Sequence, residues 1–246
     1  MKKPPGSYTL PGSARPQAGR DRGYAIRLMV AAVSVIPMFC ALIFWPAGRW
    51  DWTAGWAYVT IVGTYLLINL VYLGRVNPEV IEHRMRLGKG TKGWDIVWSV
   101  LFTPVFLAVY VVAGWDAVRF EWTTMPHWLW LLGLVLFIPG AALFTWSMAV
   151  NPFFEKTVRI QTERGHRVID TGPYHVVRHP GYVGFFGWSL SVPLLLGSWW
   201  AFLPAFAAAI GIVIRTALED RTLRAELTGY EEYATRVRYR LIPGVW

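Results

Sequence analysis

Four long stretches without Lys, Arg, Asp or Glu most constrain how this chain can fold. Each holds 19 to 23 residues, and they lie at 28–46, 54–74, 96–114 and 128–150. About 20 apolar residues are needed for a helix to cross the hydrocarbon core of a bilayer. A helix also satisfies its own backbone hydrogen bonds there, whereas the strands of a membrane barrel would alternate apolar and polar residues. The chain is therefore predicted to be an all-α, polytopic helical membrane protein.

A fifth uncharged run, residues 181–214, is too long for one comfortable span. Its 34 residues would form a helix of roughly 51 Å at about 1.5 Å per residue. The sequence LLGSWW at 195–200 interrupts the run near its middle, between Pro193 and Pro204. This pattern predicts a hairpin of two short helices, each about half of the run. The expected number of membrane segments is then six.

The net charge of +9 is interpreted as a sign of membrane topology, with no nucleic-acid partner expected. Of the 24 Lys and Arg residues, only Arg49 and Arg119 lie in the loops that follow the odd-numbered segments. Loops on the cytoplasmic side of membrane proteins are enriched in basic residues. Both ends of the chain and the loops around 75–95 and 151–180 are therefore expected on the cytoplasmic side, where basic residues can also attract anionic lipids.

Residues 1–23 are rich in Pro, Gly and basic side chains, which predicts a disordered tail before a single membrane domain at 24–246. The apolar run that follows is too long for a signal peptide and has no small-residue cleavage site, so an uncleaved anchor is expected. Cys40 is the only cysteine. A disulfide framework and a cysteine-based metal site are therefore excluded.

The side chains suited to chemistry gather in two segments, 151–182 and 215–246. The predicted hairpin connects these segments and would return the chain to the same membrane face. Arg178 and His179 would then lie beside Glu219 and Asp220. Two interpretations of the acidic pair stay open: an interfacial helix held by salt bridges, or a binding site for a ribose or a cationic ligand.

Two motifs near this region also have structural interpretations. His175 and His179 are four residues apart, as in some helical metal sites, but Pro180 biases the preceding residue away from helix. The sequence GFFGW at 184–188 has the glycine spacing of closely packed membrane helices, and a ligand-facing role is equally compatible with it.

Two sequences in this order, GPYHVVRHPGYVG (172–184) and LEDRTLRAELTGYEEYATRVRYRLIPG (218–244), resemble the isoprenylcysteine carboxyl methyltransferase family. The wider group includes phospholipid N-methyltransferases and bacterial thiol methyltransferases. NPEVIEHRM (77–85) and residues 151–174 resemble bacterial members, so a bacterial inner membrane is expected. The resemblance implies an S-adenosylmethionine-dependent methyltransferase without a Rossmann domain. Its cofactor would lie between the last two membrane helices and the cytoplasmic tail, within about 151–246.

The resemblance also implies roles for individual residues, carried over by motif position. The cofactor-binding residues implied are Tyr174, Arg178, His179, Pro180, Tyr182, Gly184, Glu219 and Asp220. The implied catalytic residues are Arg178, Glu219 and Arg236, of which Arg236 would hold an anionic acceptor. Asp220 stands where many members of the family have Glu, and no metal is implied.

The expected partners are membrane lipids and a lipophilic methyl acceptor that reaches the site from the bilayer. O-methylation of a lipophilic carboxylate is the leading hypothesis. N-methylation of a phospholipid amine and S-methylation of a small thiol are the alternatives within the same group. A membrane scaffold that has lost catalysis is the non-enzymatic alternative. A sterol reductase that uses a nicotinamide would be expected to have more than six membrane helices.

Overall fold

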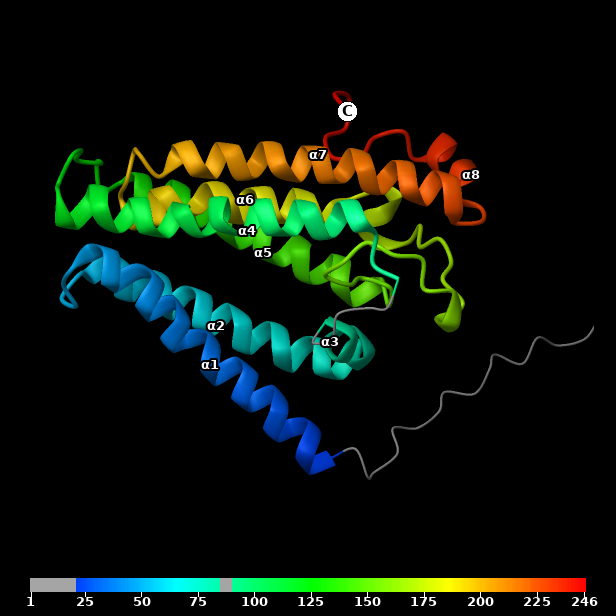
Figure 1. Ribbon diagram of the computed structural model, residues 1–246, viewed down its shortest axis with the longest axis horizontal. Helices are drawn as coiled ribbons and strands as arrows, with labels where there is room; N and C mark the ends of the chain where they lie inside the picture. Colours follow the sequence, from blue (N-terminus) through cyan, green and yellow to red (C-terminus); the bar gives the residue numbers. More distant parts are fainter. Residues whose placement is uncertain (1–20, 85–89) are drawn as a thin grey trace, which may run out of the picture.

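The molecule is an elongated bundle of helices (Figure 1). The computed structural model describes the backbone of residues 21–84 and 90–246, and the side chains of these residues except 21–33. All regular secondary structure in these ranges is helical, which confirms the predicted all-α fold there. The predicted disordered tail, 1–23, lies outside the described residues except for 21–23, which belong to the first helix.

Within the described ranges, six long helices and several short ones follow in sequence. The long helices are α1 (Asp21–Ala47), α2 (Thr53–Val76), α4 (Gly93–Gly114), α5 (Leu129–Val150), α6 (Pro180–Leu196) and α7 (Phe202–Glu226). The short ones are α3 (Pro78–Arg84), α8 (Tyr230–Arg236), the π-helix η1 (Trp115–Arg119) and the 3-10 helices η2 (Thr162–Arg164) and η3 (Gly172–His175).

Four of these helices are long and apolar enough to cross a membrane: α2, α4 together with η1, α5, and α7. Two shorter apolar helices, Ser34–Ala47 and α6, accompany them. The outer faces of the bundle are also apolar. Leu67, Val100 and Val135, on α2, α4 and α5, are each at least 60% exposed. Such surfaces suit lipid and not water, so the prediction of a polytopic helical membrane protein is confirmed.

The predicted break at 195–200 is present. Gly197 ends α6 with a positive φ of 73°, a conformation that glycine adopts without steric cost. α6 has 17 residues, as the prediction required, but α7 has 25 and is longer than predicted. The helix continues beyond the apolar run because the residues from 215 onward are good helix formers, with neither Gly nor Pro before Gly229. It therefore carries Glu219 and Asp220 in regular helical geometry.

Glycines allow α5 and α6 to pack at very short range. A Cβ atom at Gly184 would lie 2.5 Å from the carbonyl oxygen of Gly140, and one at Gly187 would lie 2.8 Å from the carbonyl oxygen of Leu136. Real side chains essentially never approach backbone atoms this closely. The GFFGW sequence therefore has the packing role that its glycine spacing suggested.

A buried carboxylate holds the connections together at one end of the bundle. Asp116, in η1, is fully buried and accepts hydrogen bonds from the hydroxyls of Thr123 (2.9 Å) and Ser198 (2.6 Å) and from the N–H of Trp200 (3.1 Å). These bonds fasten the turn between α6 and α7 to the loop after α4. The sequence interpretation did not anticipate this cluster.

The connections separate into two groups at opposite ends of the bundle (Figure 1). The loop 48–52, η1 with the loop after it, and the turn 197–201 lie at one end. At the other end lie α3, the long connection 151–179 and α8 with the residues that follow it. The polar segments singled out from the sequence therefore meet at one end of the molecule, where they cover the ends of α4, α6 and α7.

Candidate active site

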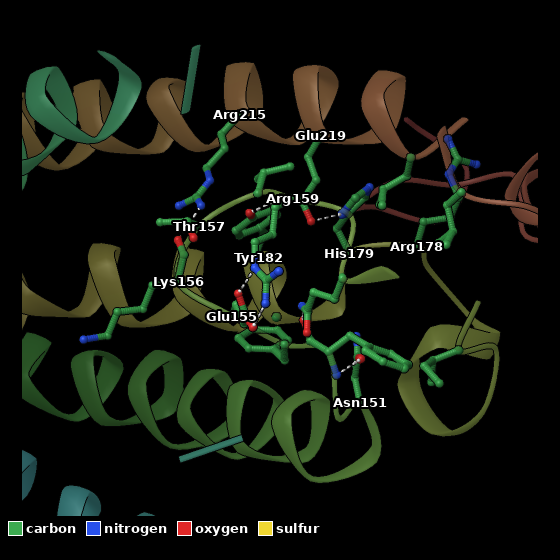
Figure 2. Close-up of a pocket in the computed structure, with 18 of the residues that line it drawn as sticks. Asn151, Glu155, Lys156, Thr157, Arg159, Arg178, His179, Tyr182, Arg215 and Glu219 are labelled. Carbon is green, nitrogen blue, oxygen red and sulfur yellow. Dashed lines mark hydrogen bonds and ion pairs between the residues drawn. The ribbon is translucent and has the colours of Figure 1, made fainter. Parts of the chain in front are cut away.

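A cavity of about 350 Å³ lies beneath the 151–179 connection. Its walls come mainly from α4, α6, α7 and the connection itself, with single side chains from α3 and α5 and two from α8. Figure 2 shows Arg215 and Glu219 entering it from α7. One part of the wall is charged and another is aromatic. The charged part includes Glu155, Arg159, Arg178, His179, Arg215 and Glu219, and the aromatic part includes Trp98, Phe102, Phe144, Phe154 and Phe185. Such a cavity suits a ligand with both a polar and an apolar part.

Arg178 is the junction between the connection, α7 and the C-terminal residues. Its Nε lies 2.7 Å from Oδ1 of Asp220, and its Nη2 lies 3.2 Å from Oδ2. Its Nη1 donates to the carbonyl oxygens of Val237 (2.7 Å) and Arg238 (2.8 Å). The side chains of Arg178 and Asp220 are 2% and 0% exposed. Four of the five guanidinium N–H groups are thus used, which gives this bidentate pair a well-defined position, so it fixes the geometry of one wall.

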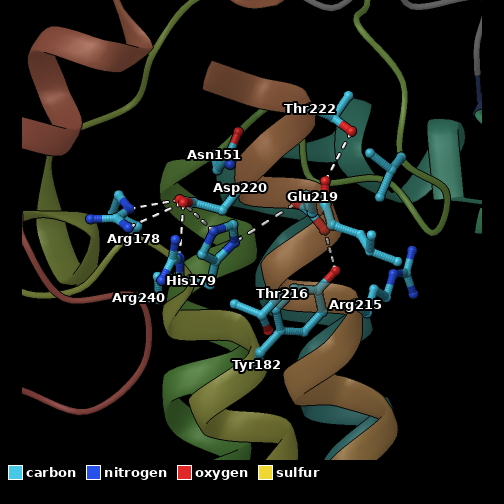
Figure 3. A network of polar contacts seen from close by, with 12 residues as sticks. Asn151, Arg178, His179, Tyr182, Arg215, Thr216, Glu219, Asp220, Thr222 and Arg240 are labelled. Atoms are coloured by element: carbon cyan, nitrogen blue, oxygen red, sulfur yellow. Dashed lines mark hydrogen bonds and ion pairs between the residues drawn. The ribbon is translucent and has the colours of Figure 1, made fainter. Parts of the chain in front are cut away.

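Asp220 collects further donors around the same carboxylate (Figure 3). Nε of Arg240 lies 2.9 Å from its Oδ2, and Nε of Arg224 lies 3.2 Å from the same atom. The hydroxyl of Tyr230 donates to Oδ1 at 3.1 Å. Asp220 is absent from the lining of the cavity, although the sequence resemblance implied a cofactor contact. Its position is that of a buried counter-ion that holds several cations in place.

Glu219 has a different environment. It lines the cavity, its side chain is 22% exposed, and it accepts a hydrogen bond from the hydroxyl of Tyr182. His179 lies between the two acids, with Nδ1 3.9 Å from Glu219 and Nε2 3.4 Å from Asp220. The His179 and Tyr182 rings are nearly parallel, with centroids 5.8 Å apart. This group offers a carboxylate and two flat rings to a ligand.

The structure brings five of the residues implied by the resemblance to the cavity wall: Tyr174, Arg178, His179, Tyr182 and Glu219. The other four do not line it. Pro180 begins α6 and is buried, as proline at a first helical position often is. Gly184 faces α5, and Asp220 faces the cations. Arg236 pairs with Asp170 at 3.1 Å, and its side chain is 58% exposed.

Several lining residues were missed at the level of sequence. Arg159 is held by Glu155 and Glu163, with its Nε 2.8 Å from Glu155 and its Nη1 2.7 Å from Glu163. The hydrogen bonds that Arg159 donates to Glu155 are the main reason that the pKa of Arg159 lies above its usual range. Arg215 pairs with the fully buried Asp95 at 3.1 Å. These pairs hold Glu155, Arg159 and Arg215 in place along the cavity.

The Asn-Pro pairs in the sequence were a signal that could have located this end of the bundle. Asn77 and Asn151 each stand at the end of a long helix, and a proline follows each, which prevents the helix from continuing. The amide of Asn77 donates to the carbonyl of Met148 at 2.9 Å, and that of Asn151 donates to the Tyr174 hydroxyl at 3.1 Å. Both side chains therefore fix the ends of helices beside the cavity.

The ionisable groups of the connection include one histidine with an altered pKa. Burial, followed by the charge of Arg159, lowers the pKa of His166. Its Nδ1 accepts a hydrogen bond from the N–H of Gln161 at 3.3 Å, which suits the neutral ring. Within the residues that the structure describes, no three His, Cys, Asp or Glu side chains come together as a metal site would require.

Comparison with known proteins gives a family match in the second half of the chain and several relatives. Residues 131–225 match the model of the isoprenylcysteine carboxyl methyltransferase (ICMT) family. Protein-S-isoprenylcysteine O-methyltransferase of Saccharomyces cerevisiae is 37% identical over 140 residues, which cover 56% of this chain and 58% of that protein. Protein-S-isoprenylcysteine O-methyltransferase B of Arabidopsis thaliana is 31% identical over 122 residues, covering 45% and 58%. The chain thus spans less than two thirds of the relatives it matches.

One solved structure, that of a eukaryotic intramembrane Ras methyltransferase ICMT, aligns with 91% of this chain and 86% of that one. The TM-score is 0.44 and the sequence identity is 18%.

Proposed function

We propose that the chain is a member of the isoprenylcysteine carboxyl methyltransferase family, whose model matches residues 131–225, and that it is an S-adenosylmethionine-dependent membrane methyltransferase. The acceptor is a lipophilic carboxylate that becomes a methyl ester. One observation supports this beyond the sequence matches: the cavity joins a polar wall with Glu219 and His179 to an aromatic wall with Trp98 and Phe102. A charged cofactor and a lipophilic acceptor can therefore meet in one space.

The residues of the polar wall fit the cofactor chemically. S-adenosylmethionine, when bound, supplies a methyl group on a positively charged sulfur. The carboxylate of Glu219 suits either that positive charge or a ribose hydroxyl, and the rings of His179 and Tyr182 suit a flat base. Tyr174 and Arg178 complete this wall. Asp220 then acts through Arg178 and His179, by holding them in position.

The protein's part in the reaction is alignment and exclusion of water. A carboxylate acceptor is already ionised at neutral pH, so no side chain has to remove a proton from it. The buried Arg178–Asp220 pair keeps the polar wall rigid, and the aromatic wall keeps water away from the apolar part of the acceptor. Holding the reacting groups in near-attack geometry can supply much of the rate.

The topology of the chain is part of the proposal. We infer six membrane segments, α1, α2, α4, α5, α6 and α7, with the cavity at the cytoplasmic face and both ends of the chain on that side. The distribution of basic residues supports this orientation, since the loop 48–52 and η1, which contain Arg49 and Arg119, lie at the end of the bundle opposite to the cavity.

The direct test is calorimetric binding of S-adenosylmethionine to the detergent-purified protein, with a nicotinamide dinucleotide as the control. Saturable binding of S-adenosylmethionine alone is the expected result. Transfer of a labelled methyl group to lipid acids, lipid amines and thiols then identifies the acceptor, because alkali releases methanol from a carboxyl methyl ester but not from an N-methyl or S-methyl product. Folded protein that binds no S-adenosylmethionine contradicts the proposal and favours the scaffold alternative.

A further inference from the structure

Arg84 is a cavity residue that the proposed reaction does not yet use. It is the last residue of α3 and lines the cavity. Its guanidinium lies over the rings of Phe144 and Phe154, with distances of 5.7 and 5.2 Å to the ring centroids. Such cation–π contacts stabilise a cation but leave its N–H donors available to a further partner. Arg84 therefore enters the cavity from the side of α5, whereas Glu219 enters it from α7.

The other arginines deep in the wall have carboxylate partners. Arg159 pairs with Glu155, Arg178 with Asp220, and Arg215 with Asp95. Arg84 pairs with no carboxylate among the residues whose side chains the structure describes. The only acidic residue outside that set is Asp21, since 1–20 and 85–89 contain neither Asp nor Glu. The positive charge of an arginine that lines a cavity without a carboxylate partner is costly, unless a ligand supplies the opposite charge.

A second cation lies near the first. Lys156 also lines the cavity and likewise pairs with no described carboxylate. Burial lowers the pKa of Arg84 to about 10, and the charge of Arg215 adds to the effect. The pKa of Lys156 is lowered by burial and then by the charge of Arg84. Arg84 therefore stays protonated at neutral pH, and neither it nor Lys156 pairs with a carboxylate among the side chains that the structure describes.

The cavity also reaches the surface that faces the bilayer. Ser99 and Thr103, one helical turn apart on α4, both line it. Thr103 is exposed, and its neighbour Val100 is 67% exposed. Beside them Trp98 and Phe102 stack at a centroid distance of 4.2 Å, and Phe102 meets Phe185 at 5.9 Å. An aromatic wall thus runs from the lipid-facing side of α4 into the cavity.

We propose that Arg84, assisted by Lys156, forms a carboxylate-binding subsite for the lipophilic acid that this enzyme methylates. The inference rests on the proposed function and adds to it the residue that selects an anionic acceptor. The acid enters beside α4 with its apolar chain along Trp98 and Phe102, and its carboxylate meets the guanidinium of Arg84. A charge-assisted bidentate contact of this kind favours an anion over a neutral or cationic acceptor.

The test measures binding without turnover. The probes are (dodecylthio)acetic acid and its methyl ester, titrated into the protein in lipid nanodiscs at neutral pH. The wild-type chain should bind the acid about tenfold more tightly than the ester, because only the acid carries the charge. Arg84→Gln should reduce this preference to about twofold or less, and Arg84→Lys should keep most of it. Arg75→Gln, an exposed arginine at the end of α2, is the matched control and should keep all of it.

S-adenosylmethionine affinity, measured on the same variants, separates the two carboxylates that could meet Arg84. If Arg84→Gln binds S-adenosylmethionine as tightly as the wild-type chain does, Arg84 does not bind the cofactor carboxylate, and the subsite belongs to the acceptor. A loss of about tenfold in that affinity, with the preference for the acid retained, would mean that Arg84 binds the cofactor carboxylate and would overturn the inference. Equal binding of acid and ester by the wild-type chain, or tighter binding of dodecylamine, would overturn it as well. The proposed function itself fails separately, if the wild-type chain binds no S-adenosylmethionine.

Discussion

Glu219 and Asp220 are neighbours on α7 but direct their carboxylates to different surroundings. Glu219 lines the cavity and accepts a hydrogen bond from Tyr182, whereas Asp220 is fully buried among Arg178, Arg224 and Arg240. Substituting each of the two acids should therefore have a different effect. One should change ligand binding and the other should change the stability of the fold.

Glu219→Gln should weaken the binding of S-adenosylmethionine by about tenfold or more, which corresponds to about 1.4 kcal/mol. The amide keeps the size of the side chain and can still accept the Tyr182 hydrogen bond, so the loss comes from the missing negative charge. Calorimetric titration measures the change. Glu232→Gln, at an exposed position on α8, is the matched control. Equal affinities for S-adenosylmethionine in the two variants would show that Glu219 does not contribute to cofactor binding.

Asp220→Asn should lower the free energy of unfolding by about 3 to 5 kcal/mol, because it leaves several buried cations without their counter-ion. The side chain of Arg178 is only 2% exposed and cannot turn to water. Thermal unfolding in detergent, compared with that of Glu219→Gln, gives the measurement. If Asp220→Asn lost cofactor affinity without losing stability, Asp220 would not be a positioning residue. It would then contact the cofactor directly.

Gly184→Ala should destabilise the protein by about 1 to 3 kcal/mol. The added methyl group would lie 2.5 Å from a backbone oxygen of α5, so the two helices would have to move apart. Gly63→Ala is the matched control, since a Cβ atom at this position on α2 meets nothing within 4 Å. Unfolding temperatures of the two variants are compared. Equal values would show that α5 and α6 tolerate a wider separation.

Asp116→Ala should also destabilise the protein, by about 2 to 4 kcal/mol, since the carboxylate accepts hydrogen bonds from Thr123, Ser198 and Trp200. The binding of S-adenosylmethionine to the folded fraction should not change, because Asp116 lies at the end opposite to the cavity. Arg119→Ala, an exposed neighbour at the same end, should leave both stability and methyl transfer intact. A large loss of activity in Arg119→Ala would contradict the proposed topology.

Acidification should destabilise the protein through His166. Its folded-state pKa lies below the usual value of 6.5, mainly because the ring is buried. Below pH 6.5 the unfolded chain binds a proton that the folded ring does not, so stability falls until the pH reaches the folded-state pKa. Unfolding temperatures between pH 7.5 and 5.5 should fall less for His166→Gln than for the wild-type chain. Parallel curves would exclude His166 as a source of the pH dependence.

The membrane helices and the meeting of the two polar segments could be predicted from the sequence for a simple reason. The length of an uncharged run identifies a span directly, and a hairpin returns the chain to the face that it left. Arg178 and Asp220, 42 residues apart, were therefore expected to be neighbours, and the structure places them in contact.

The rotation of α7 could not be predicted in the same way. Which of Glu219 and Asp220 faces the cavity depends on how this helix packs against α4 and α6, and neither residue type encodes that choice. The Asp95–Arg215 contact joins residues 120 positions apart, and Arg84 reaches the cavity only because α3 folds back under α5. Such contacts follow from tertiary packing, for which a single sequence contains no local signal.

The contact between Arg178 and the carbonyl oxygens of Val237 and Arg238 has a consequence for the biogenesis of the protein. These acceptors are 59 and 60 residues further along the chain, beyond both helices of the hairpin. A ribosome that makes this chain must therefore deliver α6 and α7 to the membrane before the partners of Arg178 exist. Insertion into the lipid and maturation of the binding site are consequently separate events, and a chain released early would be an inserted protein with an unfinished site.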